Sequence, residues 1–217
     1  MKTKRVFTVF TAICVALSVV ASIHSKNNLV GTWQYNDGTL PYGYQNGIIA
    51  IGEKGDALYA SLLSQGYEIK AEKVTMQGDK ANALFNIEGA QISVILEKNG
   101  NGVVAKTDLD GSIIHVKCEQ FNLSQALEGK WTAQVSNAPY GYQKAEINFV
   151  KGVPTVKMDG YNVPVSSFKS DLLKVTFYVT VEGESVLVSL NWKGNNLSGN
   201  ASYNGESFRI VTSRQAN

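Results

Sequence analysis

Few residues of the kinds that build catalytic or metal centres occur in this chain. It has two histidines and two cysteines among 217 residues. A serine–histidine–aspartate triad would have to use His115, and no nucleophile-elbow motif accompanies it. No cluster of His, Cys or carboxylates has metal-ligand spacing, and no glycine-rich phosphate loop stands between a strand and a helix. We therefore predict no catalytic residue, no metal site and no cofactor, and favour a protein that is not an enzyme.

An excess of charge of one sign is also lacking. The 20 basic residues stand against 18 acidic ones, a formal net charge of +2. Three of the basic residues, Lys2, Lys4 and Arg5, lie at the extreme N-terminus, and without them 17 basic residues remain against 18 acidic ones. A near-neutral surface offers no electrostatic basis for binding nucleic acid, so that class of partner is not expected.

The N-terminal residues have the three parts of a secretory signal peptide. The basic start is followed by an apolar run over residues 6–21 and by small residues at Ala21, Ser22 and Ser25. We predict a signal peptide over residues 1–25 and a protein that is periplasmic or secreted. The alternative is an uncleaved membrane anchor, for which a run of 16 residues containing hydroxyl side chains is short. No later stretch could span a bilayer as a helix.

Removal of the signal peptide would leave a single cysteine, Cys118. One cysteine cannot form an internal disulfide, even in an oxidising compartment. Cys118 alternates along the chain with Ile114 and Val116, so we expect it to face the core as an inert small apolar group. A reactive or intermolecular thiol is the alternative.

The chain contains a duplication. The pentapeptide Pro-Tyr-Gly-Tyr-Gln occurs at residues 41–45 and again at 139–143, each time eight residues after a tryptophan, Trp33 or Trp131, that closes a Gly-x-Trp unit. The copies match at an offset of 98 residues up to this pentapeptide and of 94 residues from Gly66 onward, so the first copy has four extra residues in between. Since turn glycines and apolar positions both repeat, one structural unit is used twice.

We place the two copies at residues 29–120 and 127–215. Apolar and polar residues alternate with period two in both, whereas helical periodicity is hard to find after residue 28. Turn signals rich in glycine and asparagine separate these runs every roughly 10 to 12 residues. The pattern predicts an all-β protein of two tandem antiparallel eight-stranded meander barrels, with β-sandwiches as the alternative. The joint at residues 121–126 is short, which indicates that the two units touch.

A Gly-x-Trp unit opening the first strand, a meander of eight strands and an arginine ending the last strand resemble the calycin-like (lipocalin-related) barrels, here duplicated in tandem. The second copy, from the strand of Val175 to Arg214, also resembles small exported barrel domains of bacterial proteins. The resemblance implies that the tryptophan packs across the closed end of the barrel and that an arginine of the last strand lies over it. Trp131 would pair with Arg209 or Arg214 as a cation–π contact. Trp33 lacks such a partner, because neither matching position in the first copy holds an arginine.

The duplicated pentapeptide is the best candidate for a binding site. Its proline presets a turn, its glycine permits an unusual backbone angle, and its two tyrosines could present aromatic faces and hydroxyls at a barrel mouth. The predicted ligand-binding residues of the two loops are Tyr42, Tyr44, Gln45, Tyr140, Tyr142 and Gln143. The alternative is a structural loop whose tyrosines plug the end of each barrel. Retention of the pentapeptide in both copies fits a binding loop and a structural loop equally well.

Trp192 is a further candidate for ligand contact because the copies do not share it. Lys98 stands at the matching position of the first copy. An unshared aromatic residue can be a specialised contact. Trp192 also continues the apolar face of Val186, Val188 and Leu190, so a core position is the alternative.

These patterns favour an exported β-barrel protein that binds a small apolar or carbohydrate ligand near the repeated loops. The alternative is a structural or adaptor protein with filled barrels that acts through a protein partner. A hydrolase with dispersed carboxylates is a third reading, and it requires two carboxyl groups facing each other across a cleft at roughly 5 to 10 Å. The space inside the barrels distinguishes the first two readings, because an open apolar pocket favours a ligand and packed interiors favour an adaptor.

Overall fold

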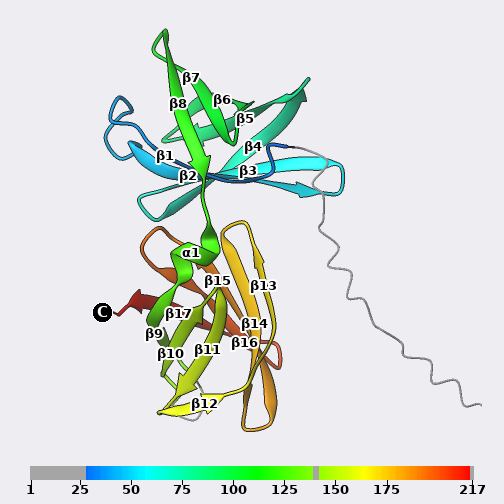
Figure 1. The fold of residues 1–217 in the computed structure, drawn as a ribbon, viewed down its shortest axis with the longest axis vertical. Coiled ribbons are helices and arrows are strands. Elements are labelled where there is room, and N and C mark those ends of the chain that lie inside the picture. The colour runs from blue at the N-terminus through cyan, green and yellow to red at the C-terminus, as the bar shows by residue number, and fades with distance from the viewer. Residues whose placement is uncertain (1–27, 139–141, 216–217) are drawn as a thin grey trace, which may run out of the picture.

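The computed structural model describes residues 28–138 and 142–215, almost wholly as antiparallel strands in two bodies along the long axis of the molecule (Figure 1). The predicted signal peptide over residues 1–25 and the predicted contact residue Tyr140 lie outside the described residues. Among the described residues, no helix has the length and apolar character needed to cross a membrane.

The first body is a closed barrel in which each strand pairs with its neighbours along the chain. Its strands are β1 (Gly31–Asn36), β2 (Asn46–Lys54), β3 (Ala57–Ser64), β4 (Tyr67–Gln77), β5 (Lys80–Ile87), β6 (Ala90–Asn99), β7 (Gly102–Leu109) and β8 (Ser112–Gln120). The barrel closes where β8 pairs antiparallel with β1, with Trp33 opposite Gln120. Closure leaves no unpaired edge strand, and it confirms the predicted eight-stranded meander barrel for the first copy.

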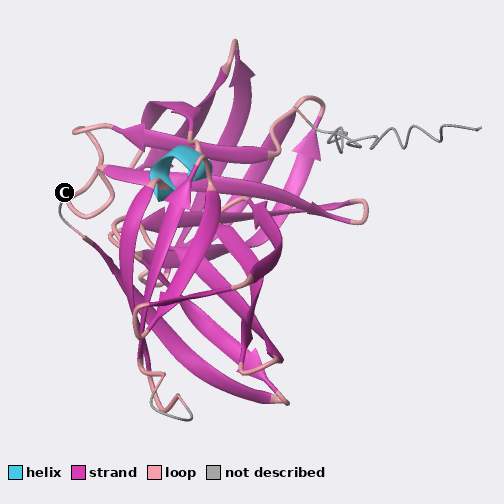
Figure 2. Ribbon diagram, turned by 60° about the horizontal axis from the view of Figure 1, so that its bottom comes forward, coloured by secondary structure: helices cyan, strands magenta, loops and turns pink. Residues whose placement is uncertain are grey.

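The second body is a nine-stranded antiparallel sheet that curls into a nearly closed barrel (Figure 2). Its strands are β9 (Gly129–Val135), β10 (Lys144–Val150), β11 (Val153–Met158), β12 (Tyr161–Val163), β13 (Val165–Asp171), β14 (Lys174–Val181), β15 (Glu184–Trp192), β16 (Leu197–Tyr203) and β17 (Glu206–Arg214). β9 pairs with both β10 and β17, and the two ends of the sheet meet where β11 lies beside β13. The predicted all-β fold of two tandem barrels is therefore confirmed.

The second barrel has one strand more than predicted because Pro164 divides a strand that is continuous in the first barrel. β4 pairs with β3 through its first residues and with β5 through the rest. In the second copy, β12 pairs with β11 and β13 pairs with β14 at the matching registers. Proline has no backbone N–H with which to continue a ladder, whereas Lys70, at the matching position of β4, has one.

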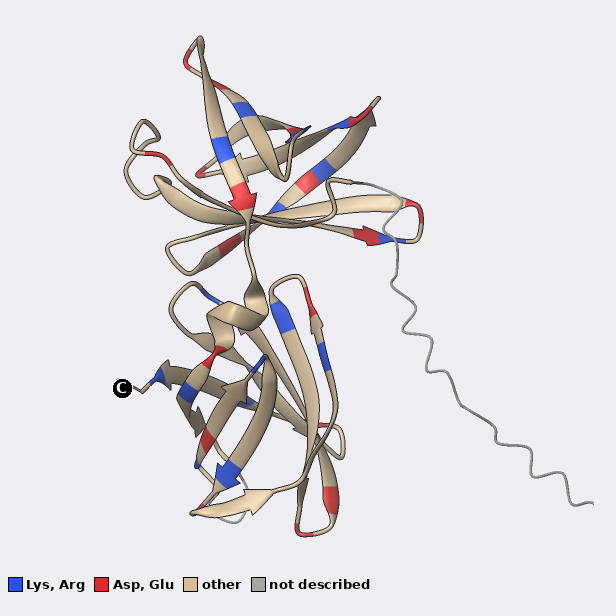
Figure 3. Cartoon of the chain, in the orientation of Figure 1, with Lys and Arg blue, Asp and Glu red and all other residues tan. Residues whose placement is uncertain are grey.

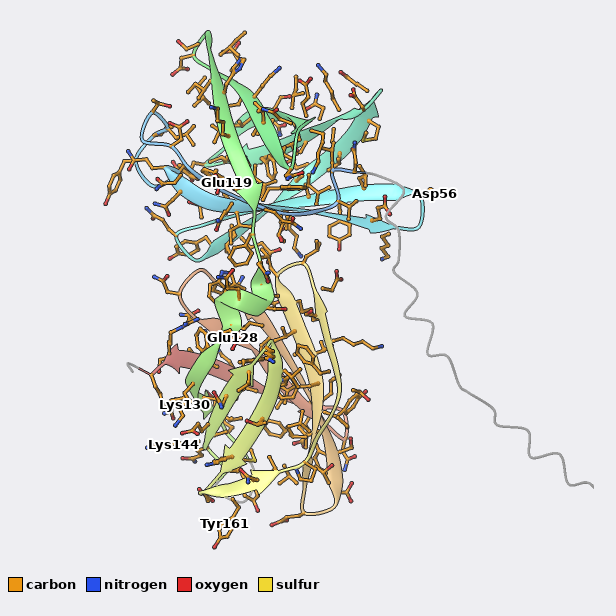
Figure 4. All side chains as sticks on the ribbon, viewed as in Figure 1. Asp56, Glu119, Glu128, Lys130, Lys144 and Tyr161 are labelled. Carbon is orange, nitrogen blue, oxygen red and sulfur yellow. The ribbon has the colours of Figure 1, made fainter. Side chains whose placement is uncertain are left out.

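The four extra residues of the first copy lengthen the β2–β3 hairpin. Ile49 pairs with Leu62 in the first barrel, and the matching pair in the second barrel is Ile147 with Val156. The longer hairpin carries Asp56 at its tip (Figure 4). Because the insertion is confined to one hairpin, the other strands of the two copies keep the same register.

Each tryptophan of the Gly-x-Trp units is buried at one end of its barrel. Trp33 Nε1 donates a hydrogen bond to the backbone oxygen of Leu29 at 2.8 Å, and Trp131 Nε1 donates to that of Leu127 at 2.8 Å. Both indoles and both leucines are buried. Leu127 ends helix α1 (Leu123–Leu127), which lies between the two barrels (Figure 1). The duplicated motif thus fills a barrel end twice while satisfying its buried donor.

A cation lies over each of these indoles, but from a different strand in each barrel. The guanidinium of Arg214 on β17 lies 4.5 Å from the ring centroid of Trp131. Arg209 lies five residues earlier on the same strand, so of the two arginines considered from the sequence Arg214 occupies this position. In the first barrel the ammonium of Lys98 on β6 lies 4.2 Å from the ring centroid of Trp33. The first copy therefore keeps the cation–π contact with another residue.

The side of the first barrel contacts the closed end of the second. Ile48 on β2 and Leu63 on β3 belong to the same buried apolar cluster as the core of the second barrel. Alternate residues of both strands face the interior of the first barrel, so β2 and β3 are buried on both faces there. Lys193 Nζ lies 3.6 Å from Glu68 Oε2 beside this contact. One end of the second barrel is thereby covered, and its other end faces away from the first barrel (Figure 1).

The first barrel should lose stability in alkaline solution because two weak acids are buried in it. Burial raises the pKa of Cys118 to about 11 and that of Tyr35 to about 12, and a charged Cys118 adds to the shift at Tyr35. Both groups are neutral when protonated. Their contribution to stability is therefore fully present below pH 9, and it is lost as the pH rises through about 11 and about 12.

Denaturant unfolding at a series of alkaline pH values checks this expectation. Tyr35→Phe keeps the ring and removes one of the two acids. Between pH 9 and pH 12, this variant should therefore lose less free energy of unfolding than the wild type. The second barrel has Ala133 and Thr212 at the matching positions, neither of which titrates. Identical pH profiles for the wild type and the variant would contradict the prediction.

Candidate functional site: a cavity in the second barrel

The second barrel contains a cavity of about 310 Å³. The residues that line it include those at the β9–β10, β11–β12, β14–β15 and β16–β17 turns, which gather at the end remote from the first barrel. Tyr161, at the start of β12, marks this end in Figure 4. The apolar lining consists of Ala133, Val135, Ala138, Ala145, Ile147, Val156, Met158, Phe177, Val179, Val181, Val186, Val188, Ala201, Phe208 and Ile210. Two tyrosines and two glutamates, at or beside the turns, complete it: Tyr142, Tyr203, Glu182 and Glu184.

Two aromatic side chains of the first core are replaced by smaller ones in the second barrel. Ala133 holds the ladder position of Tyr35, and Val179 holds that of Phe85. Tyr35 and Phe85 are buried in the first core, whereas Ala133 and Val179 line the cavity. Phe177 offsets part of the lost volume, since the first copy has an alanine there. We attribute the cavity chiefly to the loss of the Tyr35 ring.

A tyrosine of the repeated pentapeptide is hydrogen-bonded to a glutamate in both barrels. Tyr142 Oη donates to Glu182 Oε1 at 2.8 Å beside the cavity, and Tyr44 Oη donates to Glu88 Oε1 at 3.3 Å in the first barrel. The hydrogen bond to Glu182 raises the pKa of Tyr142, and desolvation and the negative charges of Glu182 and Asp159 act in the same direction. The phenol therefore stays protonated and acts as the donor, which holds Glu182 at the mouth of the cavity.

In the first barrel the pentapeptide loop closes the end of the barrel. Leu40 and Tyr44 pack against the apolar core. The hydroxyl of Ser64 donates to the backbone oxygen of Gly43 at 2.7 Å and so ties the loop to β3. Gly43 has a φ of 93°, a conformation that favours glycine. At the position of Ser64 the second copy has Met158, which lines the cavity and has no hydroxyl for such a tie.

The other residues predicted from the sequence lie elsewhere. Tyr42 is 90% exposed on the first-barrel loop. The side-chain amide of Gln45 donates to the backbone oxygen of Gly38 at 3.4 Å, within that loop. The backbone oxygen of Gln143 accepts from Val135 at 2.8 Å. Of the predicted contact residues that are described, only Tyr142 lines the cavity.

A second hollow, of about 930 Å³, lies between the two barrels. Its lining is rich in side-chain amides, from Gln34, Asn36, Asn46, Gln65, Asn195 and Asn196. Trp192 forms part of its wall and is 8% exposed. The Trp192 ring meets that of Trp131 edge-on at 6.1 Å and that of Phe121 at 5.9 Å. Its Nε1 is buried and has no hydrogen-bond partner in the described part of the chain. Trp192 thus lies where the two barrels meet, away from the cavity.

Sequence reasoning misses Ala133 and Glu184 because neither belongs to a motif. A signal was nonetheless present, since alignment of the two copies sets Ala133 against Tyr35 and Glu184 against Ala90. Comparison with protein-family models, with curated proteins and with solved structures gives no match. The cavity is therefore interpreted from its own residues.

Proposed function

We propose that this protein binds a small apolar ligand in the cavity of the second barrel. The observation that supports this most directly is an apolar hollow of about 310 Å³ bordered by polar side chains at one end. Small-molecule pockets start at about 300 Å³ and are lined mainly by hydrophobic side chains, with a few polar groups that orient the ligand. Tyr142 and Glu182, which are hydrogen-bonded to each other, are two such polar groups here.

The contrast between the two barrels is the second support. Unfilled apolar space costs stability because the lining atoms lose dispersion contacts. The first barrel fills the matching positions with Tyr35 and Phe85, so the fold itself does not require the space. A ligand in the second barrel would restore the contacts that Ala133 and Val179 leave unmade.

The arrangement also fits the calycin-like resemblance. Trp131 and Arg214 close one end of the second barrel, and the first barrel covers that end. Tyr142 and the cavity lie at the other end, where a ligand would enter. Together with the predicted signal peptide, this favours an exported, non-enzymatic ligand carrier over an adaptor with two filled barrels.

Carbohydrate is the second candidate ligand, and the hollow between the barrels favours it. Six side-chain amides can donate and accept hydrogen bonds at the same time, as sugar hydroxyls require. Trp192 adds an aromatic wall. A sugar would therefore occupy a different site from the apolar ligand.

Native mass spectrometry of the mature protein from its own source tests the proposal. We expect a small molecule that co-purifies and is lost on denaturation, and its elemental composition separates an apolar compound from a sugar. Titration calorimetry with 1-naphthylmethanol, an apolar probe, covers the case in which purification strips the ligand. An apo mass together with no binding of this probe would contradict the proposal and favour the adaptor.

A further inference from the structure

The charged side chains that line the described part of the cavity are both acidic. They are Glu182 and Glu184, which lie at the turn between β14 and β15. Figure 3 shows acidic positions at this hairpin, at the end of the second barrel remote from the first. The other described residues of the lining are uncharged. The cavity is therefore an apolar chamber with negative charge on one side of its mouth.

Glu184 belongs to the inward-facing row of β15. It shares that row with Val186 and Val188, which line the cavity, because alternate residues of a strand point to the same face. The first copy has Ala90 at the matching position. The carboxylate is thus a feature of the hollow barrel and is not needed for closing a barrel of this kind. Among the described residues, Glu184 forms no salt bridge.

Glu182 is held in place but keeps capacity to accept further hydrogen bonds. Its Oε1 accepts one hydrogen bond from Tyr142, whereas an ionised carboxylate has about four acceptor sites. Asp159, in the β11–β12 turn, is close enough for its charge to act on Tyr142 as well. The negative potential at the mouth therefore comes from two neighbouring turns.

Basic residues near this end lie on the outer wall. Lys144, Lys157 and Arg209 are each adjacent along their strands to residues that line the cavity. Since neighbouring residues of a strand point to opposite faces, these three side chains face outward. They do not neutralise the carboxylates from inside the mouth.

We infer that the ligand of the second barrel is a cationic amphiphile, with an apolar body in the cavity and a protonated amine at the mouth between Glu182 and Glu184. The inference rests on the proposed function, since it assigns the chemical class of the ligand for the same cavity. An amine placed here would donate charge-assisted hydrogen bonds to both carboxylates. A carboxylate-bearing ligand of the same shape would meet two like charges.

Three compounds with one ring system and different head groups test the charge class. They are 1-naphthylmethylamine, which is protonated at neutral pH, the alcohol 1-naphthylmethanol and the anion 1-naphthoate. Titration calorimetry at low salt should give an affinity for the amine about tenfold above that for the alcohol, as for two partly exposed ion pairs, with the anion weakest. Added salt should reduce the difference between amine and alcohol.

Variants assign that preference to the two glutamates. Glu184→Ala installs the residue that the first copy has at this position, and Glu182→Gln removes a charge while keeping an acceptor for Tyr142. The double variant should bind amine and alcohol about equally, because the amine then has neither ion-pair partner. Glu88→Gln makes the matching change in the first barrel and should leave all three affinities unchanged.

Equal affinities of the wild type for amine and alcohol would overturn the inference and leave the apolar site standing. An amine preference that survives in the double variant would overturn it as well, because the charge would then act from other residues. Binding of neither compound would remove the proposed function, and the inference with it.

Discussion

Ala133→Phe should abolish the binding of 1-naphthylmethanol while the protein remains folded. Ala133 holds the place of Tyr35, the ring of which is buried in the core of the first barrel. A ring at position 133 would occupy the space that the probe needs. Phenylalanine is a better replacement than tyrosine. The Tyr35 hydroxyl is hydrogen-bonded to Ser64, whereas Met158, which matches Ser64 in the second copy, has no hydroxyl. The affinity should fall by at least about 100-fold, which corresponds to about 3 kcal/mol.

Titration calorimetry measures this loss, and two further variants control it. Val179→Phe installs the residue of the first copy at a second lining position and should also weaken binding. Val211→Phe adds a ring of the same size on the partly exposed outer face of β17 and should bind as the wild type does. Wild-type affinity in Ala133→Phe would show that the probe binds elsewhere. A lower melting temperature in Ala133→Phe alone would indicate overpacking instead of simple filling.

The duplication made the architecture predictable. Gly-x-Trp units, turn glycines and alternating apolar residues recur at fixed offsets. They mark a barrel end, turns and core positions, and these features are present in both barrels. The ninth strand was visible in principle, because Pro164 stands where the first copy has Lys70. The period-two pattern does not reveal this break, because the apolar alternation continues across the proline. The placement of the four extra residues in the β2–β3 hairpin needed the strand register, which the sequence alone does not reveal.

The candidate site was predictable only in part. Tyr142 belongs to a repeated motif and could be found, whereas Ala133 is one alanine among many and shows its importance only beside Tyr35. Whether a barrel is hollow depends on the summed volumes of inward side chains from all its strands, and exchanges such as Phe177 for alanine partly cancel others. The contact of Arg214 with Trp131 was predicted from the resemblance. The contact of Lys98 with Trp33 was not, because Lys98 lies on β6 and not on the last strand of its barrel.

Trp131→Ala should cost the largest amount of stability of any single substitution in the second barrel. Trp131 is fully buried, donates to Leu127 at 2.8 Å, and contacts Arg214 and the ring of Trp192. Truncation of a buried tryptophan to alanine typically costs about 3–5 kcal/mol, a large share of the 5–15 kcal/mol by which small domains are stable. Trp131→Phe should cost less, because it keeps most of the ring volume. It should still destabilise the protein, because the Leu127 oxygen loses its donor.

The same substitution tests whether the two barrels unfold together. Ile48 and Leu63 of the first barrel are buried in the cluster that contains Trp131, so loss of the second barrel would expose them. In the protein without its predicted signal peptide Cys118 is the one cysteine, and it is buried in the first barrel. Its reaction with a thiol reagent reports opening of the first barrel, while binding of 1-naphthylmethanol reports the second.

We expect Trp131→Ala to abolish probe binding and also to speed the labelling of Cys118, because the first barrel loses the partner that covers β2 and β3. The matched variant Trp33→Ala removes the same hydrogen bond from the first barrel and should speed labelling more strongly. Unchanged labelling in Trp131→Ala would mean that the first barrel is stable by itself, and that the shared cluster contributes little to it. A change in the free energy of unfolding below about 0.5 kcal/mol, the range of ordinary surface substitutions, would instead contradict the structural role assigned to the repeated tryptophan.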